Sequence, residues 1–184
     1  MTSSLPSVKS AAARSSLGSV AKNPVQLPLR KFRAPSYVSP LMEVGTARGA
    51  LKLNEDEVLE LVEVRLALIG FNIASPGTRR RELRILAESV YAYSKVDHDL
   101  NPEYYCALTQ ETAIASILPR HNKPWFEGTE LAALLICSSA LIIDLIGSKC
   151  LEKLPGTTIH PGPGGTPLIT RDSFVAFLKE RFTC

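Results

Sequence analysis

The first 42 residues place the strongest constraint on the fold, because they contain five prolines and no carboxylate before Glu43. Prolines at this spacing interrupt helices and remove main-chain donors from sheets. We therefore predict a flexible or extended N-terminal arm over residues 1–45 and a single helical domain over residues 46–184. The prolines of the arm are Pro6, Pro24, Pro28, Pro35 and Pro40.

Charge is divided unevenly between these two parts. Residues 1–42 carry six Lys/Arg and no Asp/Glu, a formal charge of +6. The remaining 15 Lys/Arg and all 18 Asp/Glu give residues 43–184 a formal charge of −3. Such a division favours attraction between the two parts, or binding of a polyanion together with a neighbouring subunit. The cations of the arm are Lys9, Arg14, Lys22, Arg30, Lys31 and Arg33.

The second half of the arm places apolar residues between its cations. This pattern is typical of a segment that docks in a groove of another molecule as an extended peptide. We expect the apolar strip to contact a neighbouring subunit, and packing against its own body is the alternative. The expected contact residues are Val25, Leu27, Leu29, Phe32, Tyr37, Val38 and Leu41.

Capping signals and apolar spacing predict an all-α body, a compact bundle of about five to six helices with a Gly/Pro-rich loop before the last one. Asn54 and Glu57 form a capping-box pattern that predicts a helix from Asn54 to Ile69. Ser75-Pro76 predicts a second helix over about 76–96. No convincing strand is predicted. The remaining predicted helices cover 102–108, 110–118, 131–146 and about 172–182.

The most apolar segment, residues 131–146, bears on membranes. Its sixteen residues include Asp144, and a comfortable membrane span needs about 20 apolar residues. We therefore predict a central core helix there and no membrane span. The four cysteines form no C-x-x-C pair, which favours reduced thiols in an intracellular protein.

Seven residues are candidates for RNA contacts. Arginines cluster in the opening turns of the second predicted helix, where guanidinium groups and free main-chain amides together hold anions. The alternative is a solvated helix face on which Glu82 and Glu88 pair with these arginines. A basic loop with the only tryptophan offers base stacking, or else a cap on the core. The candidates are Arg79, Arg80, Arg81, Arg84, Arg120, Lys123 and Trp125.

The sequence contains no recognisable catalytic motif. The three histidines fall in separate predicted loops, and no nucleophile elbow or dinucleotide-binding glycine pattern occurs. The Asp97-His98-Asp99 sequence suits a divalent ion or a tuned general base, but we favour a polar helix end and turn, because the pattern lacks second partners. We expect a protein that is not an enzyme and that holds no metal or cofactor.

The layout resembles that of coat and nucleocapsid proteins of rod-shaped and filamentous RNA viruses. The resemblance rests on the arm, on the cluster from Arg79 to Arg84 and on the apolar segment 131–146. It implies a structural subunit that self-assembles through its arm, binds phosphates of single-stranded RNA non-specifically, and occurs in the virion or the host cytoplasm.

Two alternatives to this resemblance stay open. The first is a helical protein-binding module, such as a viral matrix or accessory protein, that binds no nucleic acid. The second is an organelle-imported helical protein, because the serine-rich, acid-free residues 1–40 have the composition of a transit peptide.

Overall fold

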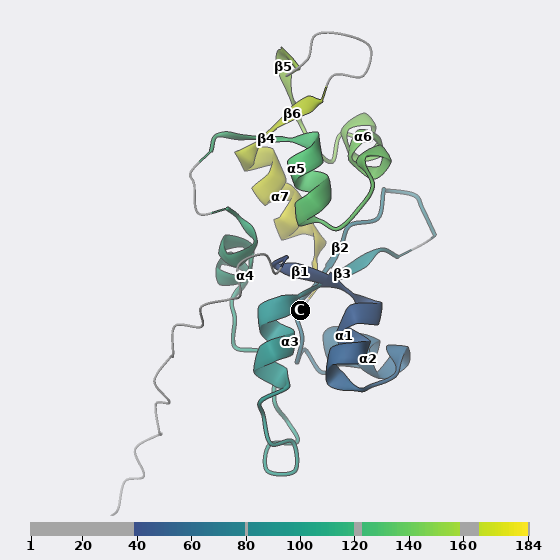
Figure 1. Cartoon of the computed structure of the whole chain (residues 1–184), viewed down its shortest axis with the longest axis vertical. Coiled ribbons are helices and arrows are strands. Elements are labelled where there is room, and N and C mark those ends of the chain that lie inside the picture. Colours follow the sequence, from purple (N-terminus) through teal and green to yellow (C-terminus); the bar gives the residue numbers. More distant parts are fainter. Residues whose placement is uncertain (1–38, 80, 120–122, 159–165, 184) are drawn as a thin grey trace, which may run out of the picture. The chain divides into compact units, whose positions relative to one another are not determined.

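The computed structural model describes residues 39–79, 81–119, 123–158 and 166–183. The chain divides into two units, Met1–Ser36 and Tyr37–Cys184, and all described residues belong to the second unit. Within this described part, seven helices and seven strands are present, and the strands form two antiparallel sheets (Figure 1). The all-α prediction is therefore wrong, and the body is a mixed α/β fold.

Sheet A brings together segments from the start, the middle and the end of the body. Its four strands lie in the order β1-β3-β2-β7, and every neighbouring pair is antiparallel. Leu41 pairs with Leu86, and Phe71 pairs with Arg84 on one side and with Phe182 on the other. The bounds are Leu41–Glu43 (β1), Gly70–Asn72 (β2), Leu83–Leu86 (β3) and Phe182–Thr183 (β7).

Both faces of sheet A are buried, each against a different hydrophobic core. Successive side chains of a strand point to opposite faces. Met42 and Ile85 accordingly join the first core, whereas Leu41 and Leu86 join the second. Three helices supply much of the first core and lie together on one side of sheet A (Figure 1). They are α1 (Val44–Leu51), α2 (Glu55–Glu63) and α3 (Ala87–Tyr93).

The second core is closed by sheet B and the other four helices. Sheet B has the strand order β4-β6-β5 and is antiparallel. The rings of Phe126 and Phe174 meet edge to face, with 5.6 Å between their centroids. The elements are α4 (Gln110–Ile117), β4 (Trp125–Glu127), α5 (Gly128–Leu134), α6 (Ser139–Gly147), β5 (Lys153–Thr158), β6 (Pro167–Thr170) and α7 (Arg171–Arg181).

Two helix starts that capping residues indicate, those of α2 and α4, are confirmed. The main-chain N–H of Glu57 donates to Asn54 Oδ1 at 2.8 Å, and Asn54 N–H donates to Glu57 Oε2 at 2.7 Å, which completes the capping box of α2. Thr109 caps α4 in the same way, accepting from the N–H of Thr112 at 3.3 Å. These contacts are local, so the sequence alone specifies them.

Three helix predictions are wrong in extent or in kind. Helix α2 ends at Glu63 rather than at Ile69, and residues 102–108 form no helix. The helix predicted over 76–96 is replaced by a turn, by β3 and by the short α3. The apolar residues of this segment also fit a strand that is buried on both faces. Such a strand lacks the alternation of apolar and polar residues that distinguishes a half-buried strand from a helix.

The apolar segment 131–146 is two helices rather than one. Helix α5 ends at Leu134, Ile136 adopts a left-handed φ of 51°, and Ser138 caps α6 by accepting from Leu141 N–H at 3.3 Å. Among the described residues, no single helix is long and apolar enough to cross a membrane. Helices α5 and α6 are long and apolar enough for a span only when they are taken together, and a bend of 111° separates them.

We predict that Gly70→Ala destabilises the fold by about 1–3 kcal/mol, because a new Cβ overpacks the first core. An added Cβ at residue 70 would lie 2.6 Å from Thr183 Oγ1 and 2.8 Å from Val62 Cγ1. Gly49→Ala in α1 is the control, because nothing lies within 4 Å of its added Cβ. This variant should raise the free energy of unfolding by about 0.5–1 kcal/mol, since alanine stabilises a helix relative to glycine. Urea unfolding measures both changes, and equal stabilities would contradict the packing described.

Candidate functional site

The arginines predicted to bind RNA do not form one basic patch at a helix start. Arg79 is exposed in the turn before β3, and Arg81 forms an ion pair with Glu63 of α2. Arg80 lies outside the described residues. Since residues 83–86 are a strand, the helix N-terminus on which the phosphate interpretation depended is not present at this cluster.

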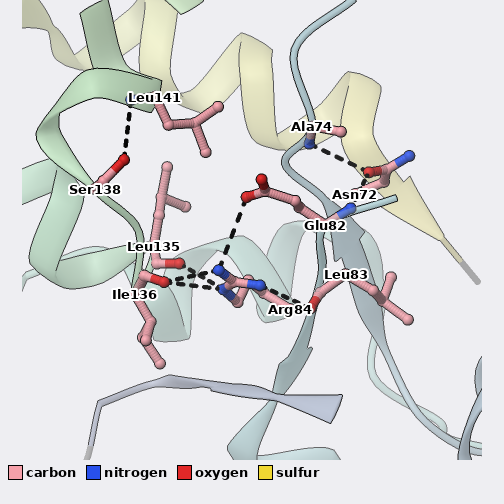
Figure 2. A network of polar contacts seen from close by, with 9 residues as sticks. All are labelled: Asn72, Ala74, Glu82, Leu83, Arg84, Leu135, Ile136, Ser138 and Leu141. Carbon is pink, nitrogen blue, oxygen red and sulfur yellow. Dashed lines mark hydrogen bonds and ion pairs between the residues drawn. The ribbon is translucent and has the colours of Figure 1, made fainter. Parts of the chain in front are cut away.

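Arg84 makes a network of contacts inside the body (Figure 2). Its Nε donates to Leu135 O at 2.9 Å and to Ile136 O at 3.2 Å, and its Nη2 donates to Ile136 O at 2.8 Å. Nη1 donates to Leu83 O at 3.1 Å, and a carboxylate oxygen of Glu82 lies 4.0 Å from Nη2. Only 12% of the Arg84 side chain is exposed.

The carbonyls that accept from Arg84 lie in the break between α5 and α6. The last carbonyls of a helix lack partners within the helix, and a cation at that end is favoured by the helix dipole. Leu135 is the C-cap of α5, and the left-handed Ile136 follows it. Arg84 therefore satisfies the carbonyls of this break and ties it to sheet A, which leaves little of the guanidinium for a phosphate.

Two further groups border this network. Asn72 Oδ1 accepts from Ala74 N–H at 3.2 Å and from Glu82 N–H at 3.3 Å, so it joins the chain leaving β2 to the chain entering β3. Burial raises the pKa of the Cys137 thiol to about 11; the charge of Arg84 opposes this shift and that of Glu82 adds to it. The thiol is therefore protonated at neutral pH and is a weak nucleophile.

In the basic and aromatic loop, Lys123 contacts both the Trp125 ring and a carboxylate. Lys123 Nζ lies 5.2 Å from the centroid of the Trp125 ring and 2.7 Å from Glu130 Oε1. Burial acts to raise the pKa of Glu130, but hydrogen bonds from Lys123 and from the Glu127 N–H, with the charge of Lys123, lower it overall. Trp125 is half-buried in β4, opposite Thr170. Arg120 lies outside the described residues.

One of the expected subunit contacts has its place within the body. Leu41 is 1% exposed and packs in the second core as part of β1. That burial accounts for its apolar side chain without a neighbouring subunit. The other six expected contacts, from Val25 to Val38, lie outside the described residues.

A surface that the sequence did not single out lies beside α2. Two exposed loops, residues 64–66 and 100–105, carry four of the six large hydrophobic side chains that are exposed in the described part of the chain. Helix α2 adds five exposed carboxylates and no cation. The signal for α2 was present in the sequence, as five acids within nine residues. The apolar residues are Val64 (72% exposed), Leu66 (40%), Leu100 (77%) and Tyr105 (67%).

The histidine with the best-defined surroundings is His98. Its ring stacks on Tyr93 with 4.0 Å between centroids, and its Nε2 lies 3.1 Å from Tyr93 O. Among the described residues, no three His, Cys, Asp or Glu side chains are placed to hold a metal ion together. The expectations of no metal and no cofactor remain predictions.

No family model matches this chain, and neither curated protein sequences nor solved structures contain a match to it. We therefore infer function from the geometry and charge of the residues themselves.

We predict that Arg84→Gln lowers the free energy of unfolding by about 1.5–3 kcal/mol, because charge-assisted hydrogen bonds to partly buried carbonyls are lost. Arg79→Gln, at an exposed position in the same segment, is the matched control and should change stability by less than about 0.5 kcal/mol. Urea unfolding compares the two variants. An Arg84 variant as stable as the control would show that the network does not hold the break between α5 and α6.

Proposed function

We propose that this protein is a structural subunit that self-assembles, with the N-terminal segment of one copy bound to the body of another. The observation that carries the proposal is the separation of charge within one chain. Residues 1–42 have a formal charge of +6, whereas residues 43–184 have −3, and α2 presents five carboxylates to solvent. Complementary charges of this kind steer association and fix its register.

The carboxylates of α2 are arranged for contact with a partner. Val58, Leu61 and Val62 of α2 are buried in the first core, and the acidic residues occupy the remaining, exposed side of the helix. Within the described part of the chain, two of these acids have a partner in the body: Glu57 completes the capping box, and Glu63 pairs with Arg81. The others are Glu55, Asp56 and Glu60.

Packaging of single-stranded RNA is the more specific form of this proposal. The acid-free segment supplies six cations, and non-specific binding to RNA needs cations that neutralise phosphates. In the body, Arg81, Arg84 and Lys123 already have carboxylate or carbonyl partners. We therefore assign phosphate neutralisation mainly to Lys9, Arg14 and Lys22 of the N-terminal segment, with the exposed Arg79 as an addition from the body. A coat or nucleocapsid subunit of this kind would occur in the virion or host cytoplasm.

A protein-binding role without nucleic acid is the second candidate. It is favoured by the exposed apolar loops at residues 64–66 and 100–105, since such surfaces suit a protein partner better than phosphates. Both candidates share the assembly step and differ in whether purified particles contain RNA.

We predict that removal of residues 2–36 converts assemblies of the full chain into monomers, as measured by light scattering. The deletion stops at the boundary between the two units and keeps Leu41 and Met42, which the two cores need. A change of Lys9 and Arg14 to Gln in the full chain is the milder control and should weaken assembly only in part.

Assemblies of unchanged size after the deletion would contradict the proposed function. The ratio of absorbance at 260 nm to that at 280 nm separates its two forms. A high ratio in particles of the full chain supports RNA packaging, and a ratio typical of protein alone supports the protein-binding role.

A further inference from the structure

The exposed apolar residues beside α2 form one surface, because hydrogen bonds hold their two loops together. The guanidinium of Arg65 donates through Nη2 to Pro102 O at 2.5 Å, and Cys106 N–H donates to Leu66 O at 3.0 Å. The loop at residues 64–66 is thereby fixed against the segment that follows Leu100. Both loops are attached to the body, so their apolar side chains are held at the surface rather than folded away.

Two depressions lie on the segments that these hydrogen bonds join. The first has a volume of about 390 Å³ and reaches from α2 across the edge of sheet A. The second, of about 380 Å³, lies in the segment from Leu100 to Tyr105. Leu66 lines the first depression, and its carbonyl is bonded to the residue that follows the second. The first is lined by Val62, Glu63, Leu66, Asn72, Arg81, Leu83 and Thr183.

Among the described residues that line these depressions, Glu63 and Glu103 are acidic and Arg81 is basic. Helix α2 borders the first depression through Val62 and Glu63, and Glu60 is exposed one turn earlier. Two described cations at this surface already have partners, Arg65 with Pro102 O and Arg81 with Glu63. The surface therefore suits an occupant that alternates apolar side chains with unpaired cations, in an extended conformation.

We propose that residues 25–33 of a second copy occupy this surface, with apolar side chains in the two depressions and cations against α2. This inference rests on the proposed function and names the receiving site. The occupant contains Val25, Leu27, Leu29 and Phe32 beside Arg30, Lys31 and Arg33, and it has no carboxylate. Nine extended residues span about 30 Å, a length that allows side chains of one segment to enter more than one depression.

Charge reversal on the receiving helix tests the site in the full chain. Glu60→Lys with Glu63→Lys should raise the dissociation constant of self-association by about tenfold or more, measured by sedimentation velocity. The fold should tolerate the change, because the Arg81 pair is exposed and cations suit a helix C-terminus. The matched control is Asp144→Lys with Glu180→Lys, which alters charge equally at exposed positions of α6 and α7 and should leave association unchanged.

Apolar contact is tested separately. Leu100→Ser should weaken self-association, whereas Ile143→Ser, which removes a side chain that is 61% exposed on α6, should not. A partner variant with Arg30→Glu, Lys31→Glu and Arg33→Glu should fail to assemble alone. Mixed with the Glu60→Lys and Glu63→Lys variant, it should restore association, because each then offers the charge that the other lacks.

The possible outcomes separate the receiving site from the proposed function. If removal of residues 2–36 abolishes assembly but the α2 variant associates like the unchanged protein, the site proposed here is wrong and the proposed function stands. Equal weakening in the α2 variant and its control also overturns the site, since it would reflect net charge alone. Association that disappears on ribonuclease treatment would assign residues 25–33 to RNA and overturn the proposal.

Discussion

Sheet A is the element on which the rest of the body depends, because it is buried on both faces and separates two hydrophobic cores. Its strands come from residues 41–43, 70–72, 83–86 and 182–183, so it cannot form until distant segments of the body meet. Alternation along β3 sends Ile85 into one core and Arg84 and Leu86 toward the other side. The position of Arg84 under the break between α5 and α6 follows directly from that alternation.

Local signals in the sequence predicted part of the local structure. Asn54 with Glu57, and Thr109, mark the starts of α2 and α4, because each cap involves residues within one turn of the chain. The local signal at Ser75-Pro76 is not followed by a helix, because the segment pairs as β3 with β1 and β2, which are far apart in the sequence. The segment 131–146 was predicted as one helix, although Ser138, between two apolar runs, also suits the N-cap of a second.

The three described arginines of the predicted RNA cluster have different surroundings. They were grouped by their proximity in the chain, but Arg79 is exposed, Arg81 pairs with Glu63, and Arg84 is bound by main-chain carbonyls. The division of charge between the N-terminal segment and the body does not depend on which residues are helical. The proposed function therefore uses the carboxylates of α2 and the acid-free N-terminal segment.

We propose that copies of this chain assemble through opposite charges on the N-terminal segment and on the body. The mass of the protein, measured by light scattering after nuclease treatment while the salt concentration is raised, tests this proposal most directly. We predict large assemblies at low ionic strength that dissociate toward monomers as salt screens the attraction between copies. A protein that stays monomeric at low salt after nuclease treatment, or assemblies indifferent to salt, would contradict it.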